Sequence, residues 1–147
     1  MRRVSSKAAL AGAVLALLAG TPAMAVEAST VAPSKQTVAG RYLDAREAYR
    51  MKQELGPRAY FIDVRTRYEV AYVGLPTVAD ANIPYVEHPD DAPWDDKAGR
   101  FKLDVNSDFG PEVARRLGAA GLGKDAPVLL ICRSGDRSAR AANLLSQ

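Results

Sequence analysis

The only cysteine of the chain, Cys132, follows a short apolar run and precedes a segment of good helix formers. Residues 128–131 contain no alternating polar residue, which predicts a strand buried on both faces. From Ser138 onward, alanines and leucines predict a helix. A tight loop between such a strand and helix directs backbone N–H groups and the positive end of the helix dipole at one point. That point binds an anion, so a cysteine there ionises readily and becomes a nucleophile.

Two arginines in the same loop, Arg133 and Arg137, add forked donors that suit sulfur or oxygen anions. The alternative is a structural cysteine at a strand end, because a free cysteine often behaves as a small hydrophobe. The reactive thiol is favoured over the structural cysteine, because the same loop contains two arginines, Gly135 and the start of a helix.

The run Cys132-Arg133-Ser134-Gly135-Asp136-Arg137-Ser138 resembles the active-site loop of the rhodanese sulfurtransferases. The resemblance implies that Cys132 is the catalytic residue and carries a sulfane sulfur as a persulfide. The donor would be thiosulfate or a related small molecule. The acceptor would be a thiol or cyanide, with a protein as a further candidate. The resemblance also implies that the rest of the loop binds the substrate: Arg133, Ser134, Gly135, Asp136, Arg137 and Ser138. In this picture Arg137 and the loop amides hold the leaving anion, and Arg133 steers donors from the rim.

Two other functions fit the same residues less well. A rhodanese-like binding module without turnover is disfavoured, because degenerate modules commonly lose the cysteine. A cysteine phosphatase is disfavoured by loop length: four residues separate Cys132 from Arg137, whereas the related dual-specificity phosphatases carry one more.

A second resemblance lies earlier in the chain, at the end of residues 59–65, whose β-branched and aromatic content predicts a strand. Asp63-Val64-Arg65 with Glu69 four residues beyond Arg65 resembles the second rhodanese signature. We expect Asp63, Arg65 and Glu69 to support the active loop without taking part in catalysis. The alternative is that these residues form surface ion pairs, each of which contributes about 0–1 kcal/mol to the stability of the fold. After Gly74 the chain departs from the family, which usually has a histidine at the next position.

The order of the remaining patterns predicts an α/β fold with a parallel sheet flanked by helices. The alternation is strand, helix, strand, short helix, strand, helix, strand, helix. Residues 45–55 are expected to form a helix, since Asp44 and Glu47 suit a capping box. Residues 85–108 are expected to form a solvated excursion. The family normally adds a strand and a helix after the cysteine-loop helix, so we expect residues 38–147 to be a rhodanese-like domain that is incomplete at its C-terminus.

The first 25 residues have the pattern of a secretory signal peptide. Three basic residues precede an apolar run over residues 8–20, which is shorter than the roughly 20 residues of a spanning helix. Ala23-Met24-Ala25 then forms a small-x-small cleavage site. Residues 26–37, which are small and polar, are expected to form a flexible leader of the mature protein.

Composition and charge exclude several function classes. The apolar fraction of 48% and the charged fraction of 25% are those of an ordinary globular domain. Residues 1–25 hold three of the 20 basic residues and none of the 17 acidic ones, so the rest of the chain has 17 of each. This balance does not favour nucleic-acid binding. One cysteine and one histidine do not predict a metal site, and the resemblance implies no cofactor.

We therefore expect a periplasmic or secreted protein that does not interact with the membrane once the signal peptide is removed. N-terminal sequencing of the protein exported from an expression host should read Val26-Glu27-Ala28. A chain that keeps its first 25 residues and stays in the membrane fraction would contradict this prediction.

Overall fold

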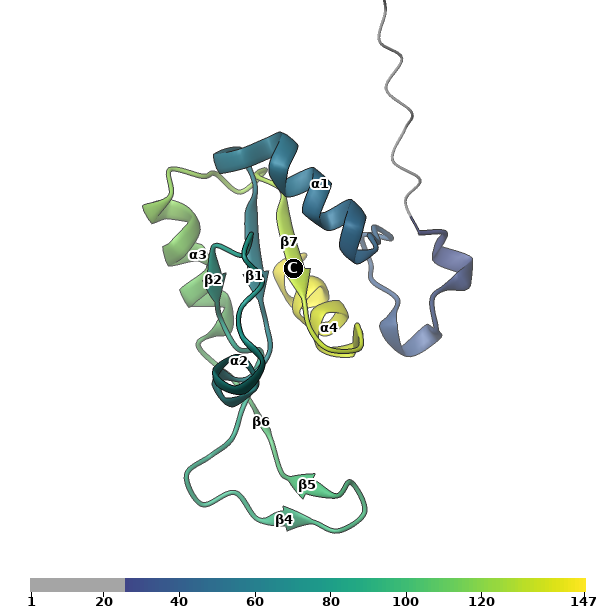
Figure 1. The fold of residues 1–147 in the computed structure, drawn as a ribbon, viewed down its shortest axis with the longest axis vertical. Coiled ribbons are helices and arrows are strands. Elements are labelled where there is room, and N and C mark those ends of the chain that lie inside the picture. Colours follow the sequence, from purple (N-terminus) through teal and green to yellow (C-terminus); the bar gives the residue numbers. More distant parts are fainter. Residues whose placement is uncertain (1–25) are drawn as a thin grey trace, which may run out of the picture.

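The computed structural model of the protein describes residues 26–147, so the expected signal peptide lies outside the described residues. Its centre is a parallel sheet in the order β2-β1-β7 (Figure 1). The strands are β1 (Tyr60–Asp63), β2 (Ala81–Asn82) and β7 (Val128–Ile131). β1 pairs with β7 over its whole length, from Tyr60 opposite Val128 to Asp63 opposite Ile131. The two strands therefore end at the same edge of the sheet.

Helices cover both faces of this sheet. On one face α1 (Ala45–Leu55) lies over Phe61 and Leu129, which line a cavity together with Ala48 and Met51 of the helix. On the other face lie α3 (Phe109–Ala119) and α4 (Asp136–Leu145). The short α2 (Arg67–Val73) follows the carboxyl end of β1 (Figure 1). The expected class, a parallel sheet flanked by helices, is confirmed.

The core lies between the sheet and the α3–α4 layer. Ile62 and Val64 are completely buried, and Phe109 and Val113 of α3 pack against them. Ile62 lies in β1 and Val64 directly follows this strand, two positions further on, so the two side chains point to the same face of the sheet. Burying side chains of this size stabilises a fold by about 1.5–3 kcal/mol each. The core thus fixes β1 and β7, the two strands whose ends carry the polar residues of interest.

Helix α1 has the bounds that its sequence predicts. The Asp44 carboxylate accepts a hydrogen bond from Glu47 N at 2.7 Å, and the Glu47 carboxylate accepts one from Asp44 N at 2.7 Å. This reciprocal pair is the predicted capping box. At the other end, Gly56 has φ +54°, a conformation that favours glycine and ends the helix.

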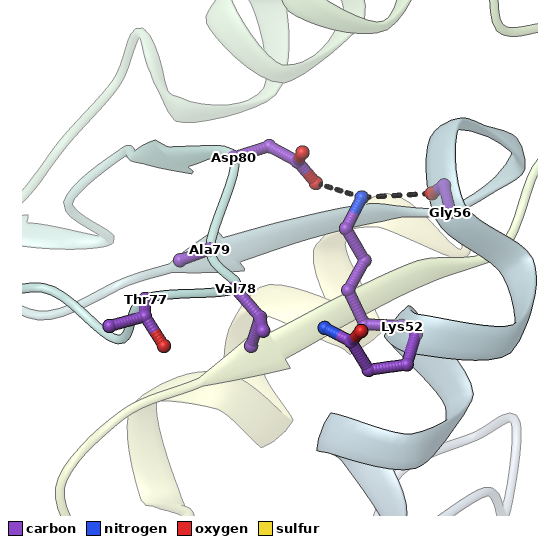
Figure 2. Close-up of a pocket in the computed structure, with 7 residues that line it drawn as sticks. Lys52, Gly56, Thr77, Val78, Ala79 and Asp80 are labelled. Atoms are coloured by element: carbon purple, nitrogen blue, oxygen red, sulfur yellow. Dashed lines mark hydrogen bonds and ion pairs between the residues drawn. The ribbon is translucent and has the colours of Figure 1, made fainter.

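A lysine bridge ties the end of α1 to the amino end of the sheet (Figure 2). Lys52 Nζ donates to Gly56 O at 3.0 Å and to Ala59 O at 2.7 Å, and it pairs with Asp80 at 2.6 Å. The Asp80 carboxylate also accepts a hydrogen bond from Phe61 N at 2.7 Å. All three donors of the ammonium are engaged within the fold, so the small pocket beside Lys52 is structural.

The expected excursion over residues 85–108 extends away from the body of the domain (Figure 1). It contains β3 (Val86–Glu87), β4 (Trp94–Asp95), β5 (Arg100–Phe101) and β6 (Asp104–Val105), paired antiparallel as β3 with β6 and β4 with β5. Trp94 packs edge-to-face on Phe101, with ring centroids 5.1 Å apart, and remains 53% exposed. The expected range begins too early, because Tyr85 is buried in the core, where it packs on Phe109, and Val86 packs against the core as well. The rest of the excursion makes its own small contacts.

The structure differs from expectation along the outer edge of β7. Of its four residues only Leu129 is buried, because β7 is an edge strand and a cavity of about 720 Å³ opens beside it. The expected first strand is absent from the described residues that precede α1. Instead, residues 40–45 line this cavity. No helix within residues 26–147 is long and apolar enough to cross a membrane.

Residues 26–37, expected to form a flexible leader, contain two short 3-10 helices, η1 (Ala28–Thr30) and η2 (Pro33–Lys35). A third, η3 (Gly56–Arg58), follows α1. Residues 33–38, which we call the strap, contact α4. Asn143 Oδ1 accepts a hydrogen bond from Val38 N at 2.8 Å, and Asn143 Nδ2 donates to Gln36 O at 3.5 Å. The stem of Lys35, which belongs to the strap, also packs on Gly135, so the strap lies beside the β7–α4 loop (Figure 1).

Candidate active site

Cys132 is the first residue after β7, at the carboxyl end of the sheet. The preceding residue pairs with the end of β1, because Val64 N donates to Ile131 O at 2.8 Å. Three residues beyond Cys132, Gly135 is the N-cap of α4. The cysteine is therefore held between a paired strand and the start of a ten-residue helix. This is the arrangement that the sequence predicts for the loop.

The chain reverses direction at Gly135, so the loop folds back toward the sulfur of Cys132. Gly135 has φ +94°, a left-handed conformation that costs an L side chain about 1–2 kcal/mol. In that conformation Gly135 N donates to Cys132 Sγ at 3.1 Å, and Ser138 N donates to Sγ at 3.5 Å. The Ser138 hydroxyl lies 3.5 Å from Sγ, within hydrogen-bond distance. The sulfur is thus surrounded by donors from the first turn of α4.

These donors change the acidity of the thiol. Partial burial of Cys132 acts to raise its pKa, since burial penalises the charged form. The hydrogen bond between Cys132 and the Ser138 hydroxyl, together with those from the N–H groups of Ser138, Ser134 and Gly135, outweighs this effect. The net effect lowers the pKa of Cys132 below its ordinary value. The site therefore favours the thiolate, which is the nucleophilic form of cysteine.

In the structure Arg137 binds a carboxylate of the protein, whereas the sequence predicts that it binds the substrate. Its Nη1 and Nη2 donate to the two carboxylate oxygens of Glu69 at 2.5 and 2.8 Å. Both side chains are mostly buried, with 18% and 28% of their surface exposed. The hydrogen bonds from Arg137 lower the pKa of Glu69 to about 2. This bidentate pair locks α4 to α2, so Arg137 fixes the loop and adds little net charge to the site.

A second carboxylate–arginine pair lies at the end of β1. Asp63 is completely buried, and its carboxylate accepts hydrogen bonds from Arg65 Nε at 2.9 and 3.0 Å. Arg65 Nη2 also donates to Gly74 O at 2.8 Å, which closes the turn after α2. Hydrogen bonding to Asp63 raises the pKa of Arg65. Asp63 and Arg65 therefore hold the geometry of this edge, and neither forms a hydrogen bond with the sulfur.

Three loop residues do not face the sulfur with their side chains. Asp136 forms an ion pair with Arg140 at 3.4 Å within the first turn of α4. Ser134 is exposed and supplies its N–H group to the cradle around Cys132. Arg133 is exposed at the rim and has no ion-pair partner among residues 26–147. Of the two loop arginines, Arg133 alone is thus available to an anion.

Sequence reasoning missed two contributors to the site. Asn82 Nδ2 donates to Asp63 O at 2.9 Å and to Arg65 O at 2.8 Å, which ties β2 to the end of β1. Lys35 of the strap lines the same cavity as Cys132 and Gly135. The polar residue within the short run 81–84 was a usable signal for Asn82, which is the last residue of β2. Nothing in the local sequence around Lys35 indicated its position.

The described residues show no other centre that could do chemistry. Within residues 26–147, no group of three or more histidine, cysteine, aspartate or glutamate side chains could hold a metal ion. The pocket beside Lys52 lies at the amino end of the sheet, where its lysine is fully paired (Figure 2). In comparisons with known proteins, no family model and no curated protein matches the chain. The candidate site is therefore the loop of Cys132.

The Glu69–Arg137 pair makes the stability of the protein depend on pH in a defined window. The folded-state pKa of Glu69, about 2, lies below its ordinary value, so the pair stabilises the fold fully above about pH 4.5. That contribution falls as the pH drops from about 4.5 toward 2. Glu69→Gln should lower the free energy of unfolding at pH 7 by about 1–3 kcal/mol.

Chemical denaturation of wild type and Glu69→Gln between pH 2 and pH 8 would check this prediction. The difference between them should be constant above pH 5 and should shrink below pH 4.5. Glu54→Gln is the control, because Glu54 is exposed and its side chain forms no ion pair within residues 26–147. A gap between wild type and Glu69→Gln that stays the same down to pH 2 would show that the pair does not act through the Glu69 charge.

Proposed function

We propose that this protein is an exported sulfurtransferase of the rhodanese type, acting in the periplasm or outside the cell. The observation that carries the proposal is the cradle around Cys132: a thiol at a strand end that accepts N–H bonds from Gly135 and Ser138. Such a cradle stabilises a thiolate and, after reaction, a persulfide anion of the same charge. The similarity of residues 132–138 to the rhodanese loop specifies which chemistry is proposed.

The first half-reaction consumes the donor. The Cys132 thiolate attacks the outer sulfur of thiosulfate, and a sulfur–sulfur bond forms between protein and donor. The sulfur–sulfur bond within thiosulfate breaks, and its electron pair leaves with sulfite. Cys132 then carries one extra sulfur as a persulfide anion, and no proton or external electron is required. The N–H groups of residues 134, 135 and 138 stabilise the negative charge before and after transfer.

The second half-reaction returns the enzyme to its starting state. A nucleophilic acceptor, cyanide or a thiolate, attacks the outer sulfur of the Cys132 persulfide. The bond between the two sulfurs breaks, and the electron pair returns to Cys132 as a thiolate. The products are thiocyanate or an acceptor persulfide. The proposed chemistry uses no metal and no organic cofactor.

The rigidity of the loop supports this function over simple partner binding. The Glu69–Arg137 pair joins α2 to α4, and the Asp63–Arg65 pair braces the end of β1. The site is therefore held from separate elements. A thiolate kept in one geometry reacts without reorganising its surroundings, which is how preorganised sites lower barriers. A module that only docks a partner has no need for a thiol of lowered pKa.

Intact-protein mass spectrometry tests the proposal. Wild type treated with thiosulfate should become heavier by one sulfur atom, and subsequent cyanide should restore the starting mass. Cys132→Ser should show neither change, because a hydroxyl cannot carry a sulfane sulfur. The matched control is wild type whose single thiol has first been alkylated. It should also gain nothing.

Two outcomes would overturn the proposal. If folded wild-type protein gains no sulfur but hydrolyses an aryl phosphate, the site is a cysteine phosphatase. If it does neither, the domain is a binding module that keeps an unused thiol. Sulfur turnover by Cys132→Ser would also contradict the assignment of the nucleophile.

A further inference from the structure

Fewer unpaired cations lie near Cys132 than the sequence suggests, so fewer are available to an anionic donor. Arg137 is neutralised by Glu69, and Arg65 by Asp63. A donor such as thiosulfate must still approach a thiolate of the same sign, which costs free energy unless a cation lies near. Arg133 supplies one such cation, from the rim of the loop.

Lys35 of the strap lies against the active loop. Its Cδ would be 3.3 Å from a Cβ atom placed on Gly135, so its aliphatic stem packs directly on the glycine that turns the loop. Lys35 also lines the cavity that contains Cys132, Gly135 and Ser138. The lysine therefore borders the sulfur cradle on the side of the strap.

The ammonium of Lys35 is available to a ligand. None of the carboxylates in residues 26–147 lies within 4.0 Å of it, and its side chain makes no hydrogen bond to those residues. Residues 1–25 contain no aspartate or glutamate. By contrast, the half-buried Lys52 has all its donors engaged. A half-buried lysine stem with an unengaged head, next to a nucleophile, is suited to anion recognition.

The strap that carries Lys35 is fastened on both sides of residue 37. Asn143 of α4 accepts a hydrogen bond from Val38 N and donates one to Gln36 O. The N–H group of Thr37 donates to the Tyr42 hydroxyl at 2.7 Å. These contacts hold the lysine backbone on α4, the helix whose first turn cradles Cys132.

We infer that Lys35 is a substrate-binding residue that draws small anionic sulfur donors to Cys132. The inference rests on the proposed function for the identity of the donor, but its electrostatic part can be tested without sulfur transfer. Lys35 and Arg133 would approach the donor from the strap and from the loop rim, while the loop amides hold the sulfur itself.

Alkylation of Cys132, the single thiol, provides the test. Iodoacetate is anionic and iodoacetamide is neutral, so the ratio of their rates reports the charge felt by an anion near the sulfur. Lys35→Met keeps an aliphatic stem against Gly135 and removes the charge. It should lower the iodoacetate rate roughly fivefold relative to the iodoacetamide rate. Lys35→Arg should retain the wild-type ratio, and high salt should reduce the difference between wild type and Lys35→Met.

Lys124→Met is the matched control, because Lys124 is exposed and precedes the opposite end of β7. It should leave the rate ratio unchanged. If Lys35→Met also leaves the ratio unchanged, the inference is wrong. Equal slowing of both reagents would contradict it as well, since Lys35 would then act by packing on the loop.

Thiosulfate kinetics extend the test to the proposed reaction. Lys35→Met should raise KM for thiosulfate roughly fivefold with little change in kcat. Wild type that shows the anion preference but gains no sulfur would refute the sulfurtransferase proposal and leave the role of Lys35 standing. Wild type that gains sulfur with a KM unaffected by Lys35→Met would refute the role of Lys35 alone.

Discussion

The hydrogen bonds that converge on Cys132 Sγ are the interaction on which the rest of the site depends. They require a chain reversal within three residues of a strand end, and Gly135 at φ +94° provides it. They also require a helix that begins immediately afterward, so that unpaired N–H groups of its first turn point at the sulfur. A side chain at residue 135 would strain this backbone and press on Lys35. The chemistry of the loop is thus set by its backbone.

The carboxylate–arginine pairs explain how so short a loop keeps its shape. Removing one member of a mostly buried pair leaves an uncompensated charge, which is strongly destabilising. Glu69 and Arg137 are 68 positions apart, and their bidentate contact joins α2 to α4 across the end of the sheet. Asp63 and Arg65 brace the neighbouring strand end in the same manner. Arg137 therefore holds the loop in place. In the function that we propose, Arg133 and Lys35 attract the anionic donor.

Local signals in the sequence were sufficient for the elements that carry the site. The capping residues of α1, the apolar run of β7 and the glycine of the loop each act within a few residues, so their structures follow from local physical chemistry. Contacts between distant segments could not be predicted in this way. The engagement of Arg137 by Glu69 depends on how α2 and α4 pack. The docking of the strap depends on Asn143, which is more than 100 positions away. The exposure of β7 depends on which strands flank it.

The most direct test of this account is a titration of the Cys132 thiolate, followed by its ultraviolet absorbance in the folded protein. Since Cys132 is the only cysteine, the signal belongs to one group. The hydrogen bonds from residues 134, 135 and 138 should place the pKa of Cys132 below the value of the same thiol without those contacts. In urea-unfolded protein the thiol should return to that value. A folded-state pKa at or above that of the unfolded protein would mean that burial outweighs the loop amides, and it would contradict the claim that this loop is built to hold a sulfur anion.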